Sequence, residues 1–234
     1  MRSAHPGKPG HVRLPSGSAE PSPASSRNSG HKMRRRLPAD IWRECHAMLD
    51  AVTPLFSDCG ALCDARCCKG GSEDGMLLFP EEALLFEERI ATVAASPGAP
   101  SEMAEPGVSG AEPGDWRLTE SQIVLPGTRE PLKLLVCNGR CSRSFRPMAC
   151  RMFPLLPWMD RHGRIRIRPD LRAYALCPLL SDPESPPICA AFAEAVRSAF
   201  ELASVLPGTR LLLESLNMEA SLLRKFFGLD SGCP

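Results

Sequence analysis

Cysteines are the residues of this chain whose type and spacing point most directly to chemistry. Four of them, Cys59, Cys63, Cys67 and Cys68, fall within ten positions of the stretch DCGALCDARCCKG. Thiolates are soft ligands, and short turns with a cysteine every three or four residues can direct several sulfurs toward one metal ion or cluster. The spacing therefore predicts metal binding, and the alternative is a set of buried, inert thiols.

A second group of cysteines follows the first after a long interval. Its members have the spacing C-x3-C-x8-C with one further cysteine beyond it: Cys137, Cys141, Cys150 and Cys177. We expect the two groups to converge, so that each is part of a composite site. Two adjacent cysteines are strained as ligands to a single ion. Cys67 and Cys68 are therefore equal candidates to be the ligand that this part of the chain contributes. Whether both of them bind distinguishes one metal site from two.

The spacing also excludes several familiar cysteine modules. Zinc ribbons and RING-type domains use paired C-x2-C units, bacterial ferredoxins use C-x2-C-x2-C, and thiol oxidoreductases use a C-x2-C pair. None of these patterns occurs in the chain. Eleven cysteines in 234 residues are too few and too clustered for a disulfide scaffold, and their odd number would leave one unpaired.

The two cysteine groups resemble those of a known family. DCGALCDARCC, followed by CNGRCSRSFRPMACRMFPLLP, is similar to the YkgJ-like cysteine-cluster family of zinc- or iron-chelating CxxCxxCC domains, over roughly residues 55–180. The most specific part is the order of six residues: Arg146, Pro147, Cys150, Arg151, Phe153 and Pro154. The resemblance implies a metal-binding protein that holds zinc, iron or an iron–sulfur cluster.

A second resemblance suggests an enzyme. The segment CDARCC, residues 63–68, is similar to the cysteine stretch of flagellin lysine N-methylases. This similarity implies, as an alternative, an iron–sulfur-dependent protein-modifying enzyme. However, the chain has no glycine-rich strand-to-helix loop for S-adenosylmethionine, and it lacks the P-loop, HExxH and GxSxG patterns. His46, expected on a helix, and His162, expected in a turn, are interpreted as incidental rather than as general bases.

Arginines are concentrated around the second cysteine group. Residues 140–172 contain nine arginines against two aspartates. They could form a solvated strand face, or they could pair with metal-bound thiolates, for which Arg146 and Arg151 are best placed because they flank Cys150. A zinc-stapled module that holds an acidic ligand or protein partner at this Arg-rich region is a further alternative. Nucleic acid is disfavoured because no aromatic residues are interleaved.

The hydrophobic pattern predicts the elements that position these residues. Apolar residues at helical spacing predict a helix over residues 39–52, directly before the first cysteine group. A short buried strand is expected at residues 76–79, followed by a helix with Pro80 in its first turn. Strands at residues 116–125 and 132–136 would then lead to Cys137.

The remaining elements follow the second cysteine group. A hairpin is expected with its turn at residues 160–163 and with the isoleucines of RIRIR facing inward. Two helices, at residues 188–206 and 210–227, are separated by Pro207 and Gly208. The predicted fold class is α+β: a small, irregular cysteine-cluster domain with short strands and flanking helices.

Composition divides the chain into three parts. Residues 1–37 are rich in Pro, Gly, Ser and Arg and are predicted to be a disordered N-terminal arm, within which Met33 is a candidate start of the protein. Residues 38–206 are interpreted as the metal-binding domain, with a flexible insertion at 95–115. Residues 207–234 are interpreted as a C-terminal helix and tail.

Charge and hydropathy bear on the compartment. The net charge is +1, which gives the whole molecule no electrostatic reason to bind a membrane or nucleic acid. No apolar run reaches the roughly 18 residues of a membrane-spanning helix, and no apolar segment follows the basic N-terminus as in a secretory signal. We therefore expect a cytoplasmic, bacterial-type protein with reduced cysteines.

Overall fold

The computed structural model describes residues 36–57, 59–69, 75–95, 116–137 and 143–228. All of them belong to one compact unit that begins at Arg36. The arm predicted over residues 1–37 falls almost wholly outside the described residues. The candidate start at Met33, nearly all of the predicted insertion at 95–115 and the candidate ligand Cys141 also fall outside them.

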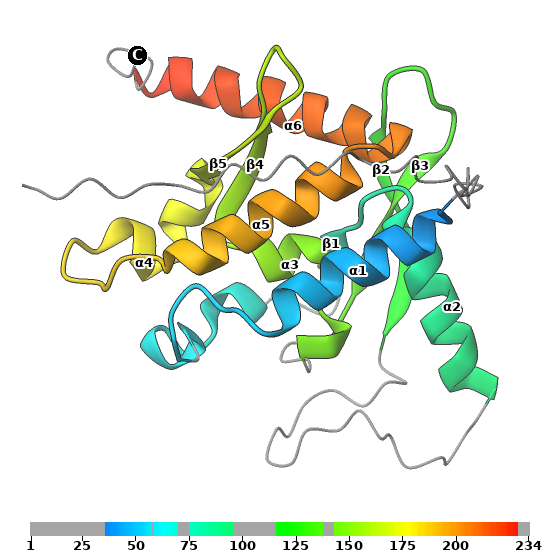
Figure 1. The fold of residues 1–234 in the computed structure, drawn as a ribbon, viewed down its shortest axis with the longest axis horizontal. Helices are drawn as coiled ribbons and strands as arrows, with labels where there is room; N and C mark the ends of the chain where they lie inside the picture. Colours follow the sequence, from blue (N-terminus) through cyan, green and yellow to red (C-terminus); the bar gives the residue numbers. More distant parts are fainter. Residues whose placement is uncertain (1–35, 58, 70–74, 96–115, 138–142, 229–234) are drawn as a thin grey trace, which may run out of the picture. The chain divides into compact units, whose positions relative to one another are not determined.

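The described chain is an α+β fold, as the hydrophobic pattern predicted (Figure 1). Its longer elements are α1 (Pro38–Asp50), β1 (Gly75–Leu77), α2 (Glu82–Ala95), β2 (Arg117–Val124), β3 (Pro131–Val136), α3 (Met148–Met152), β4 (Leu155–Met159), β5 (Ile165–Pro169), α4 (Pro178–Ser181), α5 (Ala190–Ala203) and α6 (Pro207–Phe226). Short 3-10 turns lie between them at η1 (Cys59–Leu62), η2 (Arg66–Cys68), η4 (Arg143–Phe145) and η5 (Leu171–Ala175).

The main core lies between α1, α5 and the hairpin of β4 and β5. Helices α1 and α5 lie side by side, and the hairpin packs on α5 (Figure 1). Trp42 of α1 and Phe200 of α5 both contact Phe79, with ring centroids 5.3 and 5.1 Å from that of Phe79. Because these large rings are almost fully buried, they contribute most to the hydrophobic stabilisation of α1 against α5.

A three-stranded antiparallel sheet forms a second, smaller core. Its strand order is β1-β3-β2, so that Leu135 of β3 lies between Met76 of β1 and Leu118 of β2. Helix α2 contributes Phe86 to the apolar cluster around Leu135. Cys137, the first member of the second cysteine group, follows the last residue of β3 and packs against this smaller core.

The hairpin has the turn and the alternation that its sequence predicted. Backbone amides of His162 and Arg164 donate to the Asp160 carboxylate at 2.9 and 3.0 Å, and Gly163 adopts a left-handed φ of +77°. Ile165 is buried in the main core, and Ile167 packs against it. The predicted inward orientation of the isoleucines is therefore confirmed.

Helix α6 begins three residues earlier than the sequence indicated. Pro207 occupies its first turn, where the missing N–H costs nothing, so the Pro-Gly pair starts the helix rather than separating it from the preceding one. Gly208 donates from its backbone amide to Glu81 at 2.6 Å, and a Cβ there would lie 2.8 Å from the Cβ of Pro80. Leu212 and Leu213 then join α6 to the main core. Within the described residues, no helix is both long enough and apolar enough to cross a membrane.

Candidate metal centre

The first cysteine group folds as two short 3-10 turns joined by a reversal. Cys59 opens η1, while Cys67 and Cys68 close η2. Between them, Asp64 and Ala65 both have φ near +50°, which is uncommon for residues other than glycine. The amide of Ala65 donates back to the Gly60 carbonyl at 3.0 Å. The three-residue intervals thus turn the chain back on itself and bring the thiols close together.

The second group contributes one thiol from α3 and one from the residue before α4. Cys150 lies in α3, where its amide donates to the Pro147 carbonyl at 2.9 Å. Cys177 precedes the first residue of α4 and is almost fully buried. Pro147 and Pro178 stand at the starts of α3 and α4, where their fixed φ angles favour helix initiation.

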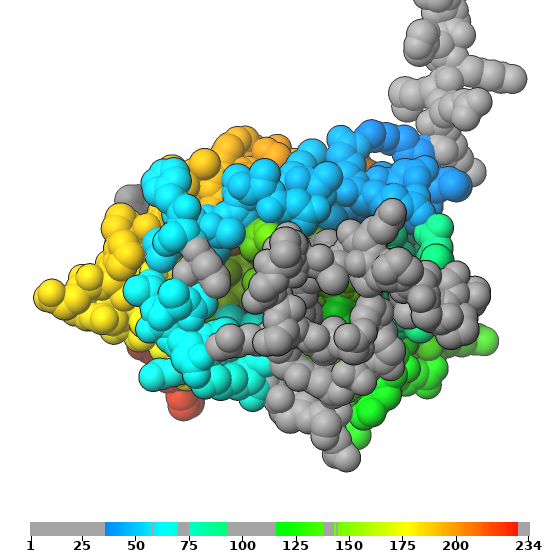
Figure 2. All heavy atoms as spheres, turned by 90° about the horizontal axis from the view of Figure 1, so that it is seen from below, coloured from blue at the N-terminus to red at the C-terminus, as the bar shows by residue number. Residues whose placement is uncertain are grey.

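Both groups meet at one small cavity of about 50 Å³. Five of the predicted ligands line it: Cys59, Cys63, Cys67, Cys150 and Cys177. Figure 2 shows the cyan segment with the first cysteine group beside the yellow segment with η5 and α4. The structure therefore brings together thiols that lie more than a hundred residues apart in the sequence, from Cys59 to Cys177.

Three predicted ligands are not placed on this cavity. Cys68 is half-buried and is not among the lining residues, although its thiol hydrogen-bonds with that of Cys67. Cys137 is half-buried at the end of β3 and packs against the smaller core. Cys141 lies outside the described residues. Of the adjacent pair, it is Cys67 that lines the cavity.

The remaining cysteines behave as core residues. Cys45 is buried, its thiol donates to the Ala199 carbonyl at 3.2 Å, and burial raises its pKa to about 12. Cys189 packs against the main core at the start of α5. Both therefore pack as small apolar residues. All nine described cysteines are thiols rather than half-cystines.

Crowding and burial raise the pKa values of two cavity thiols, Cys67 and Cys177. The pKa of Cys67 is raised by its hydrogen bond with Cys68, then by burial, and then by repulsion from its neighbouring thiolates. Burial is the largest cause of the raised pKa of Cys177, and the charge of Cys63 adds to it. The charge of a neighbouring thiolate therefore raises the pKa of both Cys67 and Cys177. A cation among them would reverse this effect, because it stabilises the thiolate form.

Arg143 joins the cavity wall to the end of α1. Its guanidinium donates to the Leu49 carbonyl at 3.1 and 2.5 Å and also to the carbonyls of Asp50 and Val52. A helix leaves its last carbonyls without intrahelical partners, and this side chain satisfies them. Burial, followed by repulsion from the neighbouring Arg146, lowers the pKa of Arg143.

Arg151 is the buried centre of the polar wall. Its side chain is fully buried, pairs with the Asp50 carboxylate and donates to the Arg146 carbonyl at 2.6 Å. It also donates to the His46 carbonyl at 3.3 Å. A buried charge is tolerated only when it is paired and hydrogen-bonded, and these contacts meet that requirement. Arg151 therefore links α3 to α1 beside Cys150.

A buried histidine–carboxylate pair lies behind this wall. His46 Nε2 is 2.8 Å from Glu82 Oε1, and both side chains are almost completely buried. The same carboxylate accepts the backbone amides of Met148 at 2.6 Å and Phe79 at 3.3 Å. Burial is the main reason that the pKa of His46 lies below its ordinary value, although Glu82 opposes the shift. Glu82 thus ties α1, the start of α2 and the start of α3 together.

The donor set suits a thiophilic metal, although the described thiols do not form a finished coordination shell. Soft thiols from two segments share one cavity with arginines that can balance thiolate charge, which fits zinc or iron chemistry. In the described ranges, no three His, Cys, Asp or Glu side chains are grouped closely enough to hold a metal ion. The cysteine side chains that line this cavity would therefore have to move closer together when a metal binds.

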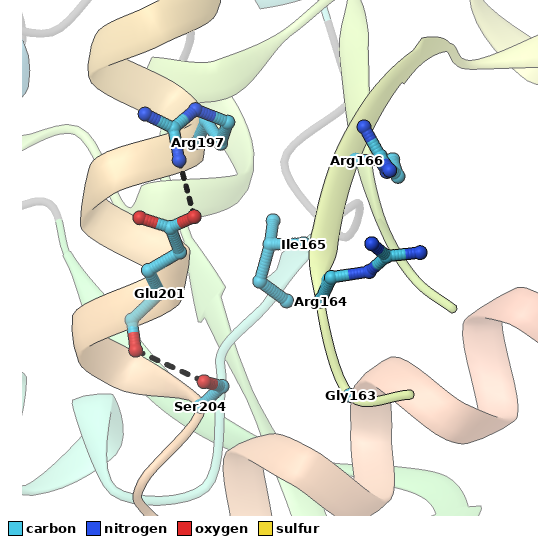
Figure 3. A pocket seen from close by; sticks show the side chains of 7 residues that line it. All are labelled: Gly163, Arg164, Ile165, Arg166, Arg197, Glu201 and Ser204. Atoms are coloured by element: carbon cyan, nitrogen blue, oxygen red, sulfur yellow. Dashed lines mark hydrogen bonds and ion pairs between the residues drawn. The ribbon is translucent and has the colours of Figure 1, made fainter. Parts of the chain in front are cut away.

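Two further arginines of the Arg-rich region, Arg164 and Arg166, line a separate, open groove of about 590 Å³. Its lining residues come from β5, the preceding turn and α5: Gly163, Arg164, Ile165, Arg166, Arg197, Glu201 and Ser204. Figure 3 shows Ile165 pointing from β5 toward α5, whereas Arg164 points away from that helix. Dashed lines in the same view join Arg197 to Glu201 and the Ser204 hydroxyl to the Glu201 carbonyl.

Acidic residues of the chain already pair with the arginines of this groove. Arg164 and Arg166 lie 2.9 and 3.8 Å from the Asp160 carboxylate. Arg197 pairs with both Glu194 and Glu201 on its own helix. An external anion would have to compete with these carboxylates, so the acidic partner expected for this region stays a prediction.

Comparison with known proteins adds no relative. No protein-family model matches the chain, and neither a curated protein nor a solved structure does. The resemblance to the YkgJ-like family stays a prediction based on the cysteine and arginine motifs. Function is therefore argued from the site itself.

Sequence reasoning missed the role of Arg143, which lines the cavity, and that of His46, which lies behind its wall. His46 was interpreted as incidental, whereas it is buried against Glu82. The signal was present, because His46 follows Trp42 by one helical turn and shares its buried face. Arg143 was counted only within the Arg-rich region, and its contact with the end of α1 spans 94 positions, which no local pattern could reveal.

Proposed function

We propose that this protein binds a thiophilic metal, as zinc, iron or an iron–sulfur cluster, between its two cysteine groups. The observation that carries the proposal is the convergence of Cys59, Cys63, Cys67, Cys150 and Cys177 on one cavity. Metal ligands must converge from distant segments on one site, whereas inert core thiols are not required to share a cavity with one another and with arginines.

The arginine wall supports a centre with net negative charge. Four thiolates around Zn²⁺, or around an iron–sulfur cluster, carry more negative charge than the metal neutralises. Arg143, Arg146 and Arg151 line the same cavity and can compensate that charge. When bound, zinc would staple the two segments together, and an iron–sulfur cluster could in addition carry electrons.

A cytoplasmic location follows from the same proposal. Thiols that bind zinc or iron must stay reduced, which a cytosolic environment provides. All nine described cysteines are thiols, in keeping with that setting.

The direct test is the metal content of the full chain purified without oxygen and without chelators. Mass spectrometry of the metals should find zinc or iron bound in a fixed ratio to protein. Visible absorption should separate the two, because iron–thiolate centres are coloured and zinc centres are not. A folded, metal-free protein that takes up neither Zn²⁺ nor Fe²⁺ would contradict the proposal.

A further inference from the structure

The second half of α6 carries an exposed apolar stripe. Met218, Leu222 and Phe226 are 61, 62 and 84 % exposed, respectively. Successive residues of an α-helix are rotated by about 100°, so positions four apart lie nearly above one another. Three large apolar side chains therefore form one continuous outward stripe. A patch of this kind marks an interaction surface more often than three scattered residues would.

The opposite face of α6 is already occupied by the body of the molecule. Leu213 is fully buried in the main core, and the Asn217 side chain donates to the Met159 carbonyl of β4 at 2.9 Å. On the other flank, Glu219 lies 3.6 Å from Arg172 of η5. These contacts fix the rotation of α6 about its axis. The stripe is thereby held facing away from the hairpin and the core.

Charged residues beside the stripe have an arrangement that suits self-pairing. Glu214 and Lys225 are both exposed and lie along the same edge of the stripe, about three helical turns apart. In an antiparallel pair of identical helices related by a two-fold axis, each edge faces the same edge of the partner in reverse order. With the axis near Ala220, Lys225 of one copy comes within one residue of Glu214 of the other.

We propose that α6 is the interface of a homodimer, in which the stripe of Met218, Leu222 and Phe226 packs antiparallel on its own copy. In this register Met218 faces Leu222 of the second copy, and the two Glu214–Lys225 pairs flank the apolar contact. The helices overlap over residues 214–226, which at 1.5 Å per residue is about 20 Å. The inference is independent of metal binding, because α6 does not line the cysteine cavity.

A lipid surface fits the stripe less well than a second copy does. Helices that lie on membranes carry mainly Lys and Arg beside their apolar face. Here two acidic residues, Glu214 and Glu219, lie beside the stripe together with Lys225. Acidic groups would be repelled by anionic lipid. Glu214, which also pairs with Arg210 of its own helix at 3.2 Å, complements Lys225 of a second copy.

Light scattering coupled to size exclusion on the full chain tests the proposal. We expect the wild-type protein to have twice the mass of one chain at tens of micromolar. Leu222→Glu should raise the dissociation constant at least about tenfold, because it buries a charge at the centre of the interface. Val205→Glu is the matched control, since Val205 is 66 % exposed and lies outside the stripe. Its dimer should be unchanged.

A charge-swap experiment tests the register. Glu214→Lys alone and Lys225→Glu alone should each be monomeric, because each homodimer would oppose like charges. Mixed together, the two variants should dimerise, since every edge contact is again between opposite charges. A monomeric wild-type chain, a mixture that stays monomeric, or binding to anionic vesicles that depends on Leu222 would each overturn the proposal.

Discussion

Glu82 Oε1 accepts a hydrogen bond from the backbone amide of Met148 at 2.6 Å. The bond joins the first residue of α2 to the first residue of α3, the helix that carries Cys150 and Arg151. Because the same carboxylate also contacts His46 of α1, three elements depend on one buried side chain. Glu82, behind the cavity, thus sets the position of α3 and of the Cys150 that it carries.

Removal of this carboxylate should destabilise the fold. Glu82→Ala leaves the Met148 amide and the His46 ring without a partner in a buried site, and we expect a loss of about 2–4 kcal/mol in the free energy of unfolding. Urea denaturation followed by circular dichroism measures it. Glu88→Ala is the control, because Glu88 is exposed and pairs only at the surface with Arg43. A change as small for Glu82→Ala as for that control would refute the anchoring role.

His46 should make stability fall in mild acid. Burial lowers its pKa in the folded chain, whereas the unfolded chain protonates the imidazole below about pH 6.5. The unfolded state therefore binds the extra proton, and the stability present above pH 6.5 is lost as the pH falls, by at most about 1.4 kcal/mol per unit.

Unfolding measured at intervals between pH 7.5 and 5.5 should show this slope. The slope should be reduced in His46→Gln and preserved in His162→Gln, because His162 is exposed in the hairpin turn. Equal slopes in the wild type and in His46→Gln would show that another group is responsible.

Arg143→Ala should loosen the junction between α1 and the cavity. The variant loses hydrogen bonds to the Leu49 and Val52 carbonyls, so we expect a loss of about 1–2 kcal/mol in unfolding free energy. If the wall also balances thiolate charge, the metal should dissociate faster in a competition with chelator. Arg161→Ala, at an exposed turn position, should change neither quantity.

Gly208→Ala should destabilise the start of α6. An added Cβ would lie 2.8 Å from both the Cβ of Pro80 and Oε1 of Glu81, closer than atoms can approach without movement. We expect a cost of about 1–3 kcal/mol from this overpacking. Thermal unfolding compares it with Ser221→Ala on the same helix, which should be neutral or slightly stabilising. If Gly208→Ala were as stable as the wild type, Pro80 and Glu81 would have to move away from residue 208 at little energetic cost.

Local patterns were sufficient to predict the hairpin and helix α1. Alternation in RIRIR and the Asp-Arg-His-Gly turn act over a few residues, so the sequence alone carries them. The start of α6 was misplaced because Pro207 fits either the end of one helix or the first turn of the next. Only its contact with Pro80 and Glu81 decides between them.

The sequence was sufficient to predict that cysteines form the candidate site. It was not sufficient to predict which of the cysteines line the cavity. Soft ligands at short spacing indicated Cys59, Cys63 and Cys67 correctly as neighbours of one cavity. No local rule distinguishes Cys67 from Cys68, because their placement depends on the left-handed turn before η2. The buried His46–Glu82 pair depends on helix packing between α1 and α2, which periodicity does not encode.

The composite nature of the metal site is tested most directly by metal stoichiometry in Cys63→Ser and in Cys177→Ser, with Cys189→Ser as control. These cysteines come from the first group, the second group and the α5 start outside the cavity. If the two groups share one centre, each of the first two variants loses nearly all bound metal, while the control keeps the wild-type ratio. Retention of about half of the metal in each, or of all of it in either, would contradict a single shared centre.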